Sequence, residues 1–224
     1  MPRTLVVSAF EPEIAPLRRR LAGRRDVQTA TVGIGAVEAA IGTTRALAAH
    51  RPDRLIFVGT AGVYTRRRAA IAVGGVAVAG ELQGVSTAAL RGDGYLPGAV
   101  ALRAQTSTPL AAALTAALGE AGRAPLSVAC PLAITRTASL GRLIAQATGA
   151  DLENLEVFAV ARAALAAGVE FGAVLGVANR VGPGGHREWL KHHRAVSRAA
   201  CDLLYRVLSA TGTPRRARTG GASG

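Results

Sequence analysis

Aromatic residues are scarce in this chain, at 4% of 224 residues, although half of the residues are hydrophobic. The core must therefore consist mainly of Ala, Val, Leu and Ile, which pack helices against a sheet whose strands are buried on both faces. The length suits one domain with a large core better than two domains. Composition alone thus favours a single α/β domain.

Lysine is almost absent, because Lys191 is the only one and arginine supplies nearly all of the positive charge behind the net charge of +13. The arginines form short clusters without a helix-turn-helix, zinc-finger or ribonucleoprotein motif. We therefore expect a solvated basic surface and no nucleic-acid partner. Nucleic-acid binding stays an alternative, and it predicts an affinity that falls steeply with salt.

The two cysteines, Cys130 and Cys201, are far apart and have no CxxC partner. Such spacing indicates a reduced chain without a disulfide framework. The chain has no apolar run of about 18 residues that would cross a membrane, and its start lacks the apolar core and cleavage site of a signal peptide. We expect a cytoplasmic protein with no membrane partner.

Short apolar runs alternate with longer segments of helical period, which indicates parallel strands joined by helices. The expected strands are 4–9, 27–32, 54–59, 71–79, 127–134 and 171–178. The expected helices are 11–21, 37–49, 109–121, 140–148, 155–167 and 187–208, and a Gly-rich irregular region follows residue 79 to about residue 98. One domain should span 1–210, and the Gly-, Arg- and Ser-rich segment 211–224 should be a disordered tail.

Two glycine-rich segments follow expected strands. The segment 33–35 (Gly-Ile-Gly) lacks the third glycine of a dinucleotide fingerprint, because Glu38 stands in its place. The segment 59–62 (Gly-Thr-Ala-Gly) is not followed by the Gly-Lys-Ser/Thr of a phosphate-binding loop. Glycines at the carboxyl edge of a sheet still let a ligand approach the backbone closely.

Three histidines near the carboxyl end, His186, His192 and His193, have no acid or cysteine at ligand spacing. Adjacent His192 and His193 face different sides of a helix. We therefore expect no metal site.

Five segments together carry a sharper signal, and they occupy residues 9–14, 33–40, 59–62, 154–161 and 176–183. In order and spacing they resemble the nucleoside phosphorylase and nucleosidase family, and the likeness extends over residues 4–208. Within that family the likeness is to the futalosine hydrolases first and to the methylthioadenosine/adenosylhomocysteine nucleosidases next. The resemblance implies an α/β fold, a three-layer α/β/α sandwich with a mixed twisted sheet. It also implies a purine nucleoside substrate, no cofactor, and a homodimer or larger homo-oligomer.

The same resemblance assigns roles to particular residues. Glu13 matches the acid that activates water at the anomeric carbon, and Glu156 matches the carboxylate that holds the ribose hydroxyls. Asn179 matches the residue that meets the purine base. The remaining substrate-binding positions that it implies are Thr60, Ala61, Gly62, Leu155 and Phe158.

Chemical reasoning supports this assignment. Glycoside cleavage passes through an oxocarbenium-like state, which needs a carboxylate near the sugar, a base for water and a donor on the departing group. An asparagine amide both donates and accepts, which suits a 6-oxopurine, whereas the adenine-specific enzymes have Asp there. Taken singly, Glu13 is equally a helix-start charge, Glu156 a solvated helix acid and Asn179 a turn former.

We therefore predict a nucleosidase that hydrolyses a futalosine- or inosine-like nucleoside. Three alternatives stay open: a phosphate-dependent phosphorylase, a methylthioadenosine/adenosylhomocysteine nucleosidase, and a catalytically silent nucleoside-binding protein on the same fold. Hydrolysis is preferred because the first strand is followed by 9–13 (Ala-Phe-Glu-Pro-Glu), and not by the glycine and downstream arginine of phosphorylases. Val157, which replaces a small residue, and Asn179 favour the silent protein, and Arg180 is a further departure from the family pattern.

Overall fold

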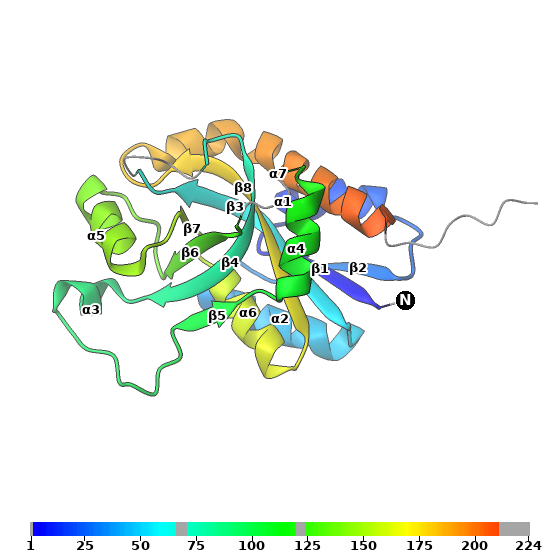
Figure 1. The fold of residues 1–224 in the computed structure, drawn as a ribbon, viewed down its shortest axis with the longest axis horizontal. Coiled ribbons are helices and arrows are strands. Elements are labelled where there is room, and N and C mark those ends of the chain that lie inside the picture. The colour runs from blue at the N-terminus through cyan, green and yellow to red at the C-terminus, as the bar shows by residue number, and fades with distance from the viewer. Residues whose placement is uncertain (1, 66–70, 120–123, 211–224) are drawn as a thin grey trace, which may run out of the picture.

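The computed structural model describes residues 2–65, 71–119 and 124–210 of the chain (Figure 1). The strands are β1 (Thr4–Ser8), β2 (Val27–Thr31), β3 (Arg54–Val63), β4 (Val76–Val85), β5 (Arg103–Gln105), β6 (Leu126–Pro131), β7 (Leu152–Glu153) and β8 (Glu170–Arg180). The helices are α1 (Glu11–Arg20), α2 (Ala36–His50), α3 (Thr87–Arg91), α4 (Thr108–Ala117), α5 (Ala138–Thr148), α6 (Val157–Ala166) and α7 (Gly185–Ala210).

The strands form one mixed sheet, in which β1 pairs in parallel with β2 and β3. Strand β8 lies between β3, with which it is parallel, and β4, with which it is antiparallel. The short strand β7 pairs with β6 and with the last two residues of β3. Because β4 also pairs with β6, the strands β3, β8, β4, β6 and β7 close into a ring.

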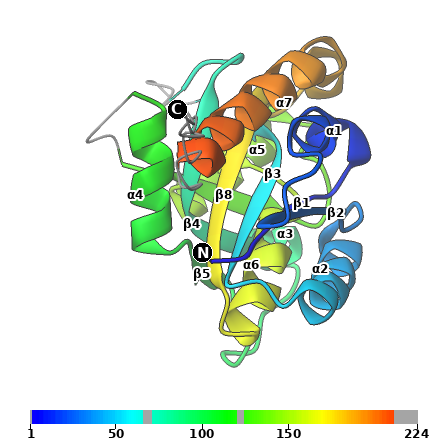
Figure 2. The same ribbon diagram turned by 90° about the vertical axis from the view of Figure 1, so that its right-hand side faces the viewer.

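Helices cover both faces of this sheet (Figure 2). Helices α1, α4 and α7 bury Ile14, Leu114 and Leu204 against one face. Helices α2 and α6 bury Leu47 and Val160 against the other. The expected α/β/α layers and mixed sheet are therefore confirmed, and the closed ring is an addition that the sequence pattern did not predict.

Strand β4 differs most from the expectation. It was predicted at 71–79, but it begins at Val76 and continues to Val85, through residues expected to be irregular. The two glycines that made this stretch look irregular serve close packing. A Cβ at Gly84 would lie 2.9 Å from the ring of Phe158, and one at Gly80 would lie 3.0 Å from Pro125.

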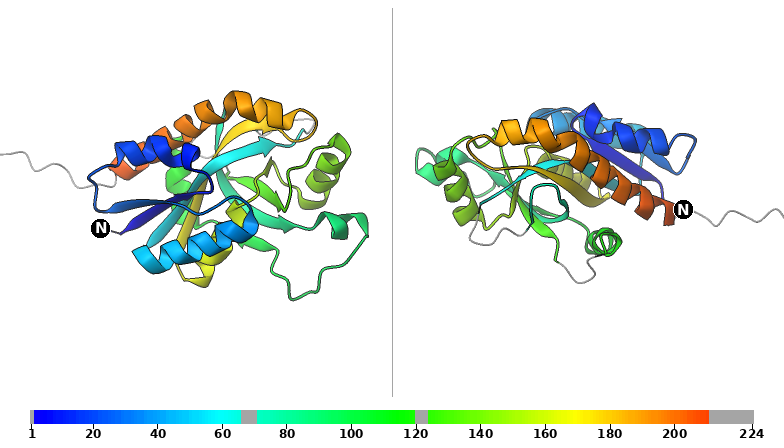
Figure 3. Two further views of the ribbon diagram at one scale, coloured as in Figure 1. Left: turned by 180° about the vertical axis from the view of Figure 1, so that it is seen from behind. Right: turned by 90° about the horizontal axis from the view of Figure 1, so that it is seen from above.

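Three short elements, α3, β5 and β7, were not predicted, because two to five residues show no periodicity. The connection from α3 to β5 extends away from the rest of the molecule, as the view from behind shows (Figure 3). Strand β8 runs two residues further than expected, which places Asn179 at the end of a strand. The predicted tail, 211–224, lies outside the described residues.

No helix in the described part of the chain is both long and apolar enough to cross a membrane.

Candidate active site

A cavity of about 280 Å³ lies at the carboxyl ends of β1, β3 and β8, the edge at which open α/β sheets bind ligands. Helix α1 contributes Glu13 and β3 contributes Thr60, Ala61 and Gly62. The strand order brings these segments together although they are distant in sequence.

Glu13 lies at the bottom of this cavity with only 6% of its surface exposed. Its Oε1 accepts a hydrogen bond from the Thr60 hydroxyl at 2.7 Å, and its Oε2 accepts one from the Ser8 hydroxyl at 3.1 Å. Burial raises the pKa of Glu13 to about 7, against the opposing effect of both hydroxyl donors. A carboxyl group that titrates near neutral pH suits general-base chemistry.

Glu156 is equally buried, at 6% exposure, just before α6. Its Oε1 accepts the backbone N–H of Gly35 at 2.9 Å. Gly35 has a φ of +87°, which favours glycine, so the Gly-Ile-Gly segment presents an N–H to this carboxylate. Burial also raises the pKa of Glu156, and the charge of Glu156 adds to the rise at Glu13.

Asn154 holds Glu156 in place. Its Oδ1 accepts the backbone N–H groups of Glu156 and Val157 at 2.9 and 2.7 Å, which satisfies donors at the start of α6. Its Nδ2 donates to the carbonyl oxygen of Thr60 at 2.9 Å. One amide therefore ties the start of α6, and with it Glu156, to β3.

Asn179 lines the cavity from the end of β8. Its Nδ2 donates to the carbonyl oxygen of Arg180 at 2.9 Å. A Cβ at Gly62 would lie 2.9 Å from that Nδ2, so the absence of a side chain at Gly62 leaves room for the amide.

The family model described as the phosphorylase superfamily matches residues 9–211. The chain belongs to the phosphorylase superfamily. The resemblance inferred from the five sequence segments is thereby confirmed.

Solved structures with the same fold include nucleosidases from two bacteria. A Helicobacter pylori methylthioadenosine/adenosylhomocysteine nucleosidase mutant with 5′-methylthioadenosine in its active site aligns with a TM-score of 0.82 and 16% identity, over 94% of this chain and 99% of that one. A Helicobacter pylori futalosine hydrolase mutant aligns with a TM-score of 0.82 and 15% identity, over 94% and 100%. The Neisseria meningitidis methylthioadenosine/adenosylhomocysteine nucleosidase, in complex with methylthio-immucillin-A, aligns with a TM-score of 0.79 and 18% identity, over 94% and 100%. No curated protein sequence matches the chain.

This superfamily member gathers most of the predicted site residues in one cavity: Glu13, Thr60, Ala61, Gly62, Leu155, Glu156 and Asn179 all line it. Phe158 is not among the lining residues, because its ring packs against Gly84 of β4. Val157 is fully buried in the core between the sheet and the helices α2 and α6, so its bulk points into the core and not into the cavity.

Sequence reasoning gave His186 no role in the cavity that it lines, and it missed three further polar residues there. Asn154 was predictable, because it lies in the segment 154–161 that carries the family resemblance and directly precedes the expected helix 155–167, where an Asn commonly accepts from the first backbone N–H groups. Trp189 donates its indole N–H to the Thr60 hydroxyl at 3.0 Å, from the second turn of α7. No local pattern announces this contact, which joins residues 129 positions apart.

Glu153 is the third. It is 7% exposed and accepts the Tyr64 hydroxyl at 2.7 Å and the backbone N–H of Thr135 at 3.0 Å. Burial, and then the neighbouring Glu153 carboxylate, raise the pKa of Tyr64. These bonds tie the loop that carries Ile134, which lines the cavity, to β3 and β7.

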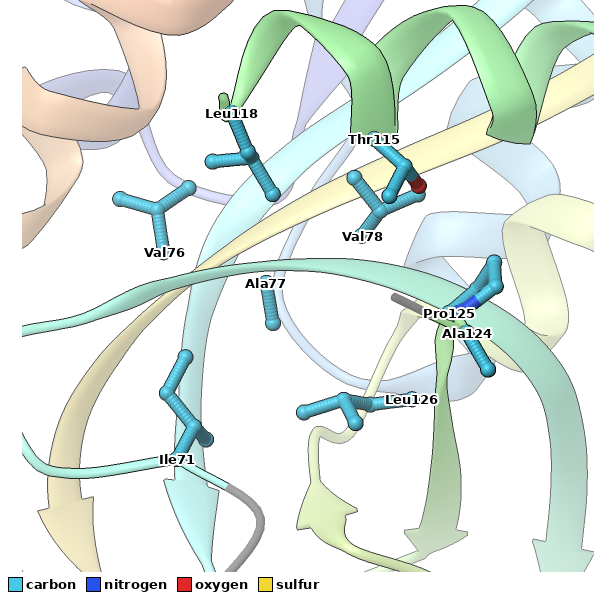
Figure 4. A pocket seen from close by; sticks show the side chains of 9 residues that line it. All are labelled: Ile71, Val76, Ala77, Val78, Thr115, Leu118, Ala124, Pro125 and Leu126. Carbon is cyan, nitrogen blue, oxygen red and sulfur yellow. The ribbon is translucent and has the colours of Figure 1, made fainter. Parts of the chain in front are cut away.

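Two other hollows lack converging acids. A small apolar cavity of about 20 Å³ between α4 and β4 includes Ile71, Leu118 and Leu126, and it is too small for a nucleoside (Figure 4). A groove of about 510 Å³ between α4 and β4 contains Glu81, which forms an ion pair with Arg103 at 2.5 Å. Within the described ranges, no three His, Cys, Asp or Glu side chains gather to hold a metal ion.

Proposed function

We propose that this protein is a nucleosidase that hydrolyses the N-glycosidic bond of a purine nucleoside, with a 6-oxopurine as the preferred base. The observation that carries the proposal is the pair of buried acids in one cavity, Glu13 and Glu156, of which Glu13 has a pKa of about 7. The fold that the chain shares with futalosine hydrolase and with methylthioadenosine/adenosylhomocysteine nucleosidases supports it.

In the proposed reaction Glu13 removes a proton from a water molecule as the water oxygen bonds to the anomeric carbon. The bond from that carbon to the purine nitrogen breaks, and its electron pair leaves with the base, which takes up a proton from solvent, while Glu13 returns its proton to solvent. Positive charge that develops on the sugar ring is stabilised by buried carboxylates. Glu156, oriented by Gly35 and Asn154, accepts from the ribose hydroxyls.

Asn179 is the proposed reader of the base, since its amide can donate to a purine oxygen and accept from a ring N–H. Its position at the end of β8, in the same cavity as Glu13 and Glu156, supports this role. A 6-oxopurine offers both of these groups, whereas a 6-aminopurine offers a donor where the oxygen would be.

Hydrolysis is favoured over phosphorolysis by the charge of the cavity. The described residues that line the cavity include the apolar Phe10 and Ile34 but no arginine or lysine. A phosphate dianion beside two carboxylates would need a cationic partner. Among the described residues, the arginines lie outside the lining of this cavity, so none of them supplies that cationic partner.

The test is a substrate panel of inosine, futalosine, adenosylhomocysteine and methylthioadenosine, with chromatographic detection of the freed base. We expect release of hypoxanthine without added phosphate, and loss of release in Glu13→Gln. Turnover only with phosphate would assign a phosphorylase. Preferred release of adenine would assign the adenine-specific alternative. Calorimetric binding of purine nucleosides without any release would assign a silent binding protein.

We also propose a homodimer or larger homo-oligomer that covers the cavity mouth. Ile34 and Ile134 line the cavity yet are 61% and 59% exposed, and Val37 at the start of α2 is 68% exposed. Contiguous apolar side chains of this kind mark interaction surfaces. Sedimentation analysis of the parent and of Val37→Glu tests it: a monomeric parent would contradict the proposal.

A further inference from the structure

The single tryptophan of the chain, Trp189, reaches the cavity from α7 and touches the hydrogen-bond network of Glu13. Its Nε1 lies 3.0 Å from Thr60 Oγ1, and the same Oγ1 lies 2.7 Å from Glu13 Oε1. Three elements, α7, β3 and α1, thus meet in one chain of two hydrogen bonds.

The direction of these bonds follows from the chemistry of the groups. An indole N–H only donates, and a threonine hydroxyl has one proton and lone pairs that accept. Thr60 must therefore accept from Trp189, which leaves its own proton for Glu13. Without the indole, the hydroxyl is free to turn and accept a proton from a neutral Glu13 carboxyl.

Ser8 does not impose the same direction. Its Oγ lies 3.1 Å from Glu13 Oε2 but also 3.3 Å from the carbonyl oxygen of Phe10, so its proton has two acceptors. Ser8 Oγ also accepts the backbone N–H of Phe10 at 3.4 Å, but its proton still has these two acceptors, whereas the Thr60 hydroxyl accepts from Trp189 and donates to Glu13.

The indole plane is itself held by a stack of rings on α7. The centroid of the Trp189 ring lies 4.1 Å from the centroid of the His193 ring and 5.9 Å from that of the His186 ring, and both interplanar angles are 12°. His193 is buried, so one side of the stack is anchored in the protein. Residues three and four apart share one face of a helix, which explains why these three rings align.

We propose that Trp189 is a positioning residue that directs the Thr60 hydroxyl proton onto Glu13 and so keeps this buried carboxyl group in its proton-accepting form. The inference rests on the proposed role of Glu13 as the base that activates water. It adds a residue that acts on Glu13 through Thr60.

The first test is the pH profile of kcat/KM in Trp189→Phe, which keeps one aromatic ring in the stack and removes the N–H together with the five-membered ring of the indole. The acidic limb should move to higher pH by roughly half to one unit, the size that one hydrogen bond supplies. The plateau at high pH should change much less. Leu190→Ala, at an exposed position of the same helix, is the matched control and should leave the limb in place. An unshifted limb in Trp189→Phe overturns the proposal.

The second test needs no substrate, because Trp189 is the only indole and its fluorescence reports on this network. The titratable groups that face it are His186 and His193 on α7 and, around the cavity, Glu13, Glu153 and Glu156. We expect an emission change with a midpoint near pH 7 that is lost in Glu13→Gln and kept in His186→Gln.

Persistence of that step in Glu13→Gln overturns the link between Trp189 and Glu13. If the protein releases no base from any nucleoside, the proposed function fails, yet the fluorescence titration still decides whether the indole and the carboxyl group are coupled. The two failures are therefore distinguishable.

Discussion

Two hollows in the described part of the molecule differ in a way that size does not predict. The groove beside α4 measures about 510 Å³ and the cavity at the carboxyl ends of β1, β3 and β8 about 280 Å³. In the groove, the side chain of Glu81 is 33% exposed and its charge is compensated by Arg103. In the cavity, Glu13 and Glu156 are buried and accept hydrogen bonds from hydroxyl and backbone donors. Burial raises the pKa of both cavity acids, to about 7 at Glu13, whereas Glu81 lies partly exposed beside a cation.

The sharpest test of this comparison removes one carboxylate from each hollow. Glu13→Gln should lower kcat on the order of 10² to 10⁴-fold, the usual contribution of a general base. Glu81→Gln, a change of the same kind in the larger groove, should leave kcat as in the parent. Both variants are measured by base release under saturating substrate. Equal activity of the two variants would mean that the smaller cavity is not the reaction site.

Base selectivity provides the next effect. Asn179→Asp should lower 6-oxopurine turnover and raise 6-aminopurine turnover, because an ionised carboxylate faces the O6 atom as acceptor against acceptor. An unpaired buried acceptor costs about 1 to 3 kcal/mol, which is roughly ten- to a hundredfold in rate when felt in the transition state. The measurement is the ratio of kcat/KM for inosine-type and adenosine-type substrates. An unchanged ratio would remove Asn179 from the proposed base contact.

The burial that suits Glu13 to accept a proton should also lower the stability of the protein when Glu13 is ionised. Its pKa in the folded protein, about 7, lies above the ordinary value of 4.5, so the folded state binds more protons than the unfolded state between these values. The free energy of unfolding should therefore fall as pH rises from about 4.5 to 7. In Glu13→Gln this loss is absent. The difference in unfolding free energy between the variant and the parent should therefore shift in favour of the variant by up to about 3 kcal/mol from pH 4 to pH 8.

Denaturant unfolding at both pH values measures this gain. Glu81→Gln, whose partner Arg103 is well exposed, should change stability by less than about 1 kcal/mol. A Glu13→Gln variant with the same pH dependence as the parent would show that burial does not destabilise the ionised group.

The smallest expected effect concerns Glu153, the third buried acid of the cavity. Tyr64→Phe removes the 2.7 Å donor to Glu153 and should destabilise the protein by about 1 to 3 kcal/mol. Tyr95→Phe is the matched control, because Tyr95 is 87% exposed and its change should be near zero. Thermal unfolding of the two variants gives the comparison. Equal midpoints would mean that the Tyr64 hydroxyl does not stabilise Glu153.

The fold class was predictable because its signal is local and repeated. Buried strands are nearly continuous apolar runs, and helices such as α7 have a periodic apolar face. Strand β4 was misplaced for an equally physical reason. The absence of a side chain at Gly80 and Gly84 lets Pro125 and Phe158 pack against the strand. Close packing between segments that are distant in sequence has no local sequence pattern.

The site divides in the same way. The sequence by itself determined that the chain belongs to the phosphorylase superfamily. The order of its motifs pointed to Glu13, Glu156 and Asn179 before any contact was known. Only the tertiary structure decided how these groups are supported. Trp189 reaches Thr60 across 129 positions, and Phe158 turns toward Gly84 and away from the cavity. A motif records the type and spacing of residues, whereas hydrogen-bond direction, burial and the resulting pKa depend on which distant elements the closed sheet brings together.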